Sequence, residues 1–267
     1  MKIYIDFEVN KIQELRLIHA ISEQGIEVVV PKEQAYKFKP LKEKFNMDYV
    51  VASASGIPLS QHMEIDHETP KTTIGNSVCS LIFPKIQVQY LRNNWSAKRP
   101  YKFSFSGLIT PVRHVVIQNW LTEQLKSKKQ LNYNSKQLIS RIKNKFNRLF
   151  SKKTQVHKYN DLYISSSTNG RHFPEKSWDQ EYYNFLLKSK FVLCPSGDYV
   201  WSYRFFEAIL CGAIPVIEEF CSVYEGYKYV TLKENAHTLE YNFEDALFNY
   251  KLCVSRITLR ESFDLSL

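Results

Sequence analysis

The N-terminal third of the chain alternates between short apolar runs and longer segments in which apolar residues recur at helical spacing. The apolar runs predict three strands, over Lys2–Val9, Ile26–Val30 and Asp48–Ala54. The segments between them predict two helices, over Ile12–Gln24 and Lys32–Phe45. A β-α-β-α-β alternation of this kind is typical of a Rossmann-like lobe, in which ligands gather at the carboxyl ends of the parallel strands.

The same alternation resumes after Lys98-Arg99-Pro100, which we take as the boundary between two lobes. The pattern then predicts these elements in order: strand Tyr101–Leu108, helix His114–Leu125, strands Asp161–Ser166 and Phe191–Cys194, helix Tyr203–Cys211, strands Ala213–Ile217 and Tyr229–Leu232, and helix Phe243–Arg260. The βαβ unit over 191–217 should make its two strands parallel neighbours. We therefore expect an α/β protein with an N-terminal lobe at 1–97 and a C-terminal lobe at 98–267. The last helix is long enough to cross back to the N-terminal lobe.

The cysteines and the hydropathy of the chain bear on whether it is a disulfide-bonded, zinc-binding or membrane-spanning protein. The five cysteines are scattered and form no C-x-x-C pair, so they predict buried thiols in a reducing compartment and neither a disulfide framework nor a zinc site. No charged and apolar leader opens the chain, and no apolar run approaches the 18 or so residues that span a bilayer. We expect a cytoplasmic protein, peripheral at the inner face of a membrane if it contacts one.

The positive charge of the chain is concentrated in one insertion. Residues 125–160 hold eleven Lys and Arg residues and no Asp or Glu, which exceeds the net charge of +9 of the whole chain. Apolar residues within it share one helical stripe, at Leu138, Ile142, Phe146 and Leu149. A basic amphipathic helix of this kind is typical of binding to an anionic membrane surface or a polyanionic acceptor. It can equally be a helix that packs its stripe on the lobe. Nucleic acid is not expected as a partner, because no DNA- or RNA-binding motif accompanies the charge.

Two arginines at predicted helix starts indicate an anion site. Ser202 is placed to cap its helix and Arg204 lies in the first turn, where the positive end of the macrodipole makes a cation unfavourable. An anion held by the helix N-terminus, the Ser196-Gly197 backbone and the guanidinium would reverse that sign. Arg113 repeats this placement at the start of the preceding helix.

Glu207 follows Arg204 by three residues and shares its helix face. An ionised carboxylate only accepts hydrogen bonds, so it suits a sugar diol, and phosphate plus diol is the shape of a nucleotide diphosphate. The competing interpretation is a plain Arg–Glu pair on a solvated helix face. Charge alone does not decide between the two.

Several sequence blocks in this region resemble the exostosin-like glycosyltransferases. The blocks agree with the family pattern in order and spacing, over Ser189-Lys190-Phe191, Cys194-Pro195-Ser196-Gly197, Ser202-Tyr203-Arg204-Phe205-Phe206-Glu207-Ala208 and Gly212-Ala213-Ile214-Pro215-Val216. Upstream, the run from Arg99 to Gly107 and the following Arg113 resemble the family's basic and aromatic strand with its glycine and arginine. The likeness covers about Arg99 to Phe220, with Ser127 to Asn160 poorly matched. The N-terminal lobe shows no alignable motif, and the family's usual secretory-pathway anchor is missing.

The resemblance implies a GT-B fold, two Rossmann-like lobes with parallel sheets facing a central cleft, and a donor held by the C-terminal lobe. It implies that Arg113 and Arg204 bind the diphosphate of a nucleotide sugar and that Glu207 binds its ribose. It also implies inverting transfer to an acceptor hydroxyl by a single displacement. We expect a UDP- or GDP-sugar as donor substrate, no cofactor, a glycan or lipid-linked acceptor, and a role in surface polysaccharide or glycan synthesis.

Such a displacement needs a base to take the acceptor proton. The titratable segment His62–Glu68 offers His62 and Asp66, and the end of the first strand offers Glu8. We favour Asp66 and Glu8, while a solvated loop is the simpler interpretation of the segment. A strict D-x-D motif is absent, and the arginines can neutralise a diphosphate, so no metal is expected. Arg171, in the polar loop 167–172, is a further candidate for the diphosphate.

Two alternatives stay open. Asp198-Tyr199-Val200 before the arginine helix resembles fucosyltransferases, which share the fold but use another donor. The chain could also be a non-catalytic glycan- or membrane-binding protein that retains the lobe without the base.

Overall fold

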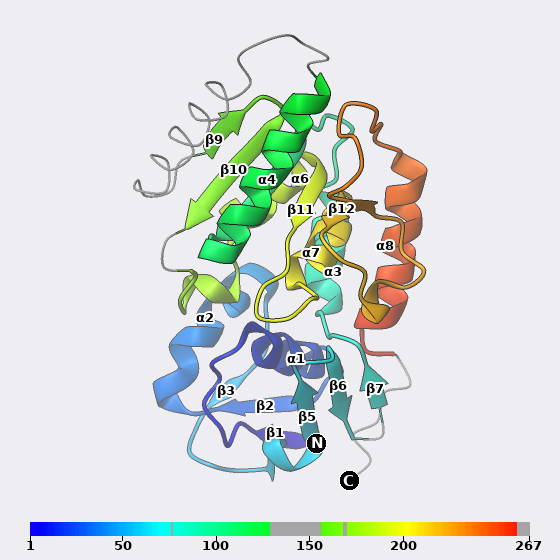
Figure 1. Ribbon diagram of the computed structural model, residues 1–267. Coiled ribbons are helices and arrows are strands. Elements are labelled where there is room, and N and C mark those ends of the chain that lie inside the picture. The colour runs from blue at the N-terminus through cyan, green and yellow to red at the C-terminus, as the bar shows by residue number, and fades with distance from the viewer. Residues whose placement is uncertain (76, 129–155, 168–169, 261–267) are drawn as a thin grey trace. The chain divides into compact units, whose positions relative to one another are not determined.

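The computed structural model describes residues 1–75, 77–128, 156–167 and 170–260. Its internal contacts divide the chain into two compact units (Figure 1). The first unit holds Met1–Asn94, Arg171–Glu181 and the chain from Lys251, and the second holds Trp95–Gly170 and Tyr182–Tyr250, each within the described ranges. This division differs from the expected lobes 1–97 and 98–267 in its first boundary, after Asn94, and in the two later segments of the first unit. Phe173, Trp178 and Leu259, which lie in those segments, belong to the apolar core of the first unit.

The first unit contains a parallel sheet of the order β3-β2-β1-β4. Its strands are short: β1 is Lys2–Tyr4, β2 Glu27–Val30, β3 Val50–Val51 and β4 Ile57–Pro58. Ile3 of β1 pairs with Val28 on one side and with Ile57 on the other. This strand order is that of a Rossmann half, so the predicted class of the N-terminal lobe is confirmed.

The helices of the first unit follow the predicted apolar pattern. Helix α1 spans Ile12–Ser22 and helix α2 spans Ala35–Phe45, preceded by a short 3-10 turn at Lys32–Gln34. Leu15 and Ile18 of α1 and Phe38 and Leu41 of α2 are buried in one core with the sheet. Gly25 has a φ of +75°, which lets the chain turn from α1 into β2 without a steric penalty.

A second, antiparallel sheet of the first unit was not predicted. It has the order β5-β6-β7, with β5 at Met63–Asp66, β6 at Lys71–Ile74 and β7 at Ser77–Cys79, and it follows a 3-10 turn at Leu59–His62. Helix α3 then spans Lys85–Asn93. The titratable segment 62–68 is therefore partly a paired strand and not simply a loop.

The second unit is built on a six-stranded sheet of the order β13-β12-β11-β8-β10-β9. All neighbouring strands are parallel except β9 and β10. The strands are β8 Tyr101–Leu108, β9 Val156–Tyr159, β10 Leu162–Ser167, β11 Ser189–Cys194, β12 Ile214–Ile217 and β13 Val230–Thr231. The predicted parallel pairing of the two strands in the βαβ unit is confirmed, with Phe191 opposite Ile214.

Within the described residues, four helices accompany this sheet: α4 Pro111–Lys128, α6 Gln180–Leu187, α7 Tyr203–Leu210 and α8 Phe243–Ile257. Helix α6 is divided between the units after Glu181, and α8 after Tyr250. Short 3-10 turns lie at Glu175–Ser177 in the first unit and Ser222–Tyr224 in the second. Phe103 and Phe105 of β8 face the same side and pack with Trp120 of α4 and Ala246 of α8.

The strand order locates a ligand crevice in the second unit. Its first strand, β8, is central; the chain goes to β10 on one side and then returns to β11 on the other. The loops leaving β8 and β11 therefore turn to opposite faces of the sheet. In open parallel sheets, ligands bind at the carboxyl ends of the strands where the order reverses in this way. The expected site is the edge after Leu108 and Cys194.

Within the described ranges, no helix combines the length and apolar character that a membrane crossing requires. All five cysteines have free thiols. Most of the basic insertion, residues 129–155, lies outside the described residues, so its amphipathic helix stays a prediction.

Candidate functional site

The two predicted arginines lie at helix starts that follow the two central strands of the second sheet. Helix α7 begins after Ser202, whose Oγ accepts a hydrogen bond of 3.2 Å from the backbone N–H of Arg204, so the predicted cap is confirmed. Helix α4 begins at Pro111, earlier than predicted, and Thr110 Oγ1 accepts a bond of 3.3 Å from the N–H of Arg113. Both arginines thus lie in the first turn of a helix, at the carboxyl edge of β8 or β11.

Each of the two guanidinium groups contacts the strand, or the loop after the strand, that precedes the other arginine; we call Arg113 and Arg204 the crossed arginines. Arg204 follows β11 but reaches β8, where its Nε donates to Ser106 O at 2.8 Å. Arg113 follows β8 but reaches the loop after β11, where its Nε donates to Ser196 O at 3.2 Å, and its Nη1 donates to Leu108 O at 3.2 Å. Each arginine therefore spans the point at which the strand order reverses.

Each guanidinium lies on a glycine that leaves space for it. A Cβ on Gly107 would stand 2.5 Å from Nη2 of Arg204, and a Cβ on Gly197 would overlap Nη2 of Arg113. Gly107 also has a φ of +138°, which other residues rarely adopt. The glycines in the resembling blocks thus have a shared physical role, which is to let the backbone approach the arginines.

The charges of this pair are not neutralised within the described part of the protein. Arg204 is 7% exposed and its Nη1 has no hydrogen-bond partner there, and neither arginine has a carboxylate within 4.0 Å. Burial lowers the pKa of Arg113, and the neighbouring charge of Arg204 lowers it further, while Asp198 acts in the opposite direction. Two close cations, one of them buried with an unused donor, are costly unless an anion joins them. This arrangement fits an anionic ligand.

Glu207 lies one turn further along α7 and is 2% exposed. Its Oε2 accepts a hydrogen bond of 2.6 Å from the hydroxyl of Tyr182, on α6. No ion pair joins it to Arg204 in the described part of the chain, and both side chains are buried. A plain Arg–Glu pair on a solvated face is therefore the wrong interpretation, whereas ribose binding by Glu207 stays a prediction. Tyr182 lies in the sequence run that resembles the family, but its bond to Glu207 was not predicted, because that bond depends on the packing of α6 beside α7.

The loop after β11 is held by its own hydrogen bonds. The N–H of Ser196 donates to Glu218 Oε2 at 3.3 Å, and the N–H of Gly197 donates to Tyr199 O at 3.0 Å. Ser196 Oγ donates to Val200 O at 3.3 Å. These two residues therefore support Arg113 through the Ser196 carbonyl and the open face of Gly197. Direct donation by their N–H groups to an anion would require them to exchange partners.

Arg171 belongs to the first unit and not to the unit that carries the crossed arginines. Its Nη1 lies 3.9 Å from Asp179 Oδ2. The role of Arg171 in binding a diphosphate stays a prediction.

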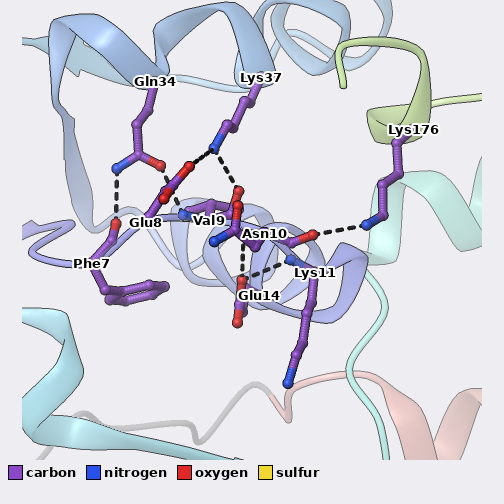
Figure 2. Close-up of polar contacts among 9 residues, drawn as sticks. All are labelled: Phe7, Glu8, Val9, Asn10, Lys11, Glu14, Gln34, Lys37 and Lys176. Carbon is purple, nitrogen blue, oxygen red and sulfur yellow. Dashed lines mark hydrogen bonds and ion pairs between the residues drawn. The ribbon is translucent and has the colours of Figure 1, made fainter. Parts of the chain in front are cut away.

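Glu8 lies in the loop that follows β1, at the carboxyl edge of the first unit's parallel sheet (Figure 2). Its side chain is 72% exposed, and its Oε1 is 3.5 Å from Nζ of buried Lys37. Lys37 Nζ also donates to Val9 O at 2.7 Å, and Gln34 accepts from Val9 N and donates to Phe7 O, each at 2.8 Å. The backbone around Glu8 is thus fixed by two side chains of the segment 32–45, which the sequence did not single out.

The other end of the same loop is fixed by α1 and by the segment 171–181 (Figure 2). Glu14 Oε2 accepts from the N–H groups of Asn10 and Lys11, at 2.8 and 2.9 Å, and Lys176 Nζ donates to Asn10 O at 2.8 Å. Glu8 therefore projects from a loop that is held on both sides.

Asp66 has a different environment at the end of β5. Its carboxylate accepts from the hydroxyl and N–H of Thr69 and from the N–H of Glu68, which closes the turn to β6. The hydrogen bond from the Thr69 hydroxyl, followed by that from Glu68, lowers the pKa of Asp66. Glu8, in contrast, contacts Lys37 at 3.5 Å and is more exposed than Asp66. The role of either carboxylate as the base stays a prediction.

Asp6 follows β1 and contacts the 3-10 turn at Leu59–His62. Its carboxylate accepts from the N–H of Ser60 at 2.9 Å and from the Ser60 hydroxyl. Burial alone would raise the pKa of Asp6, but the bonds from Ser60 outweigh it and the pKa is lowered. In the described ranges, no three His, Cys, Asp or Glu side chains gather in a way that could hold a metal ion.

No curated protein matches the chain. The model of the exostosin GT47 domain matches residues 82–257, about two thirds of the chain, which include α3, the whole described second unit and α8. The match contains both crossed arginines, both glycines beneath them and Glu207. The chain therefore belongs to the exostosin GT47 family, which is of the GT-B type, and the protein is a glycosyltransferase.

Proposed function

We propose that the protein transfers a sugar from a UDP- or GDP-sugar to a hydroxyl of a glycan or lipid-linked acceptor. The observation that carries this proposal is the crossed pair Arg113 and Arg204 at the reversal of strand order in the second sheet. A nucleotide diphosphate supplies adjacent anionic groups, which suit two neighbouring guanidinium groups better than a single carboxylate does. The unpartnered Nη1 of Arg204 would gain an acceptor.

The same groups suit the chemistry of the transfer. As the bond between the anomeric carbon and the diphosphate breaks, negative charge grows on the departing phosphate oxygen. Guanidinium groups that are fixed in place by backbone carbonyls stabilise this charge without having to reorganise. The arginines could therefore support departure of the leaving group by themselves, and we propose no metal requirement.

Glu207 is the proposed ribose ligand. A carboxylate offers about four acceptor positions, so it can accept from a diol while it keeps the bond from Tyr182. The bond from the phenol fixes one oxygen of the carboxylate. We also propose that the diphosphate contacts Arg171, Ser196 and Gly197. Fewer observations support these contacts, because Arg171 belongs to the other unit and the N–H groups of Ser196 and Gly197 already donate within the protein.

The proposed base is Glu8, with Asp66 as the second candidate. Inversion by a single displacement requires a carboxylate that accepts the acceptor proton as the sugar moves. Glu8 is exposed on a fixed loop at the carboxyl edge of the first parallel sheet, where ligands of such sheets bind. The basic insertion 125–160 supports an anionic membrane or acceptor as partner, through its charge alone.

Release of nucleoside diphosphate from a panel of UDP- and GDP-sugars, with and without acceptor, tests the proposal. Wild-type protein should release nucleotide from one donor, and Arg204→Ala should lower that rate by roughly 10² to 10³, as loss of one fixed charge-stabilising donor does. Arg256→Ala, which removes an exposed arginine from α8, is the matched control and should retain the wild-type rate. Circular dichroism melting verifies that Arg204→Ala is folded.

The outcomes separate the alternatives. Release from GDP-fucose alone would favour the fucosyltransferase alternative. Absence of release from every donor, with nucleotide bound, would favour a non-catalytic binding protein. A wild-type rate in folded Arg204→Ala would refute the site.

A further inference from the structure

A line of aromatic rings lies in the loop between Gly197 and helix α7. Tyr199 and Trp201 are nearly parallel, with ring centroids 6.2 Å apart and planes 11° apart. Trp201 meets Tyr203, the first residue of α7, edge to face at 4.7 Å. The centroid distance of the parallel pair is that of an offset stack. Trp201 is 5% exposed, whereas Tyr199 is 41% exposed.

The position of Tyr199 sets it apart from other exposed aromatic residues. It lies two residues after Gly197, on which the guanidinium of Arg113 rests, and its carbonyl accepts the Gly197 N–H. The chain between them spans at most about 7 Å. An extended ligand whose phosphates meet Arg113 would therefore bring its next groups within reach of this ring.

The loop holds Tyr199 in place before any ligand arrives. Ser196 Oγ bonds to Val200 O, and the N–H of Ser202 donates to Tyr224 Oη at 2.8 Å. The nearly parallel ring of Trp201, which is buried, lies beside that of Tyr199. An aromatic side chain that is already fixed loses little conformational entropy when a second ring stacks on it.

We propose that the exposed ring of Tyr199 is the stacking platform for the nucleobase of the donor. This inference rests on the proposed function, since it deepens the donor site. A flat heteroaromatic ring extends the stack of Tyr199 on Trp201 face to face, whereas the puckered ring of a pyranose does not. Stacking accepts any base, because every base has a π face, so the platform adds affinity for nucleotides without selecting uracil or guanine.

Calorimetric titration with UDP, GDP and inorganic pyrophosphate tests the inference. Tyr199→Ala should weaken UDP and GDP at least tenfold, within the range of alanine substitutions at stacked bases, and should change pyrophosphate less than twofold. Tyr199→Phe keeps the ring and should bind all three ligands within about twofold of wild type. Tyr36→Ala removes a tyrosine of similar exposure from α2 of the first unit and should leave the binding of all three ligands unchanged.

The results distinguish failure of the platform from failure of the proposed function. Nucleotide binding by Tyr199→Ala equal to wild type would overturn the platform and leave the diphosphate site standing. Equal loss of pyrophosphate and nucleotides would assign Tyr199 to loop structure and would also overturn the platform. A wild-type protein that binds none of the three ligands would refute the proposed function together with the inference.

Discussion

Replacing Gly197 with alanine tests the crossed-arginine site with a single methyl group. Ordinary van der Waals contact begins at 3.4 Å, and the added Cβ would be roughly 1 Å closer than that to Nη2 of Arg113. Gly197 does not have a positive φ, so alanine causes no backbone strain there. The atom in the way is the far end of a flexible side chain. The guanidinium can therefore move aside, and Gly197→Ala should displace Arg113 and weaken its two backbone bonds while the protein stays folded.

The expected loss follows from the contacts of Arg113. Its bonds to Ser196 O and Leu108 O, both 3.2 Å, fix the guanidinium, and a shift of about 1 Å breaks that geometry. A hydrogen bond to a charged group contributes about 1.5 to 3 kcal/mol. Loss of one such bond to the diphosphate lowers donor affinity roughly 10- to 150-fold. A misplacement of this size lowers kcat/KM for the donor by a similar factor, about 10².

The assay is calorimetric binding of UDP and GDP, together with initial rates of nucleotide release. Gly25→Ala is the control, because its Cβ would meet nothing within 4 Å while its φ of +75° strains alanine. Gly25→Ala should cost about 1 to 2 kcal/mol of stability and leave nucleotide binding unchanged, whereas Gly197→Ala should weaken nucleotide binding. Nucleotide affinity of Gly197→Ala within twofold of wild type would refute the reasoning.

Two further predictions concern stability. Gly212→Ala should destabilise the second unit by roughly 3 kcal/mol, because a Cβ there would stand 2.5 Å from Arg99 Nη2 and 2.6 Å from the Trp95 ring at a φ of +74°; urea unfolding that shows no greater loss than Gly25→Ala would contradict this. His19 is buried and burial lowers its pKa to about 4 from 6.5, so folding favours the neutral ring. Below pH 6.5 the ring binds a proton in the unfolded chain but not in the folded protein, so the free energy of unfolding falls until the pH reaches about 4. The free energy of unfolding of the wild type should therefore drop by roughly 2 to 3 kcal/mol between pH 7 and 4.5. His19→Leu should lack this drop.

Local patterns explain what could be predicted about the second unit. The helix after Ser202 has its cap and its first-turn arginine within a few residues of each other, and both were predicted. The strands on either side of it are short apolar runs, and the βαβ rule makes them parallel neighbours. In the first unit, β3 was overestimated and β4 was missed. These strands have only two residues each, so their pairing is set by neighbouring strands and not by their own composition.

The sequence by itself determined the fold class and the family, and it singled out Arg113 and Arg204 as candidates, because these depend on periodicity and on motifs with short spacing. Only the tertiary structure decided that Arg113, which follows β8, bonds to the loop after β11, and that Arg204, which follows β11, bonds to β8. Arg113 bonds to Ser196, 83 positions away, and Arg204 to Ser106, 98 positions away, because β8 and β11 are neighbours in the sheet. The burial of Glu207 and its bond to Tyr182 were likewise decided by packing. Contacts of such separation depend on sheet order and register, which hydrophobic periodicity does not encode.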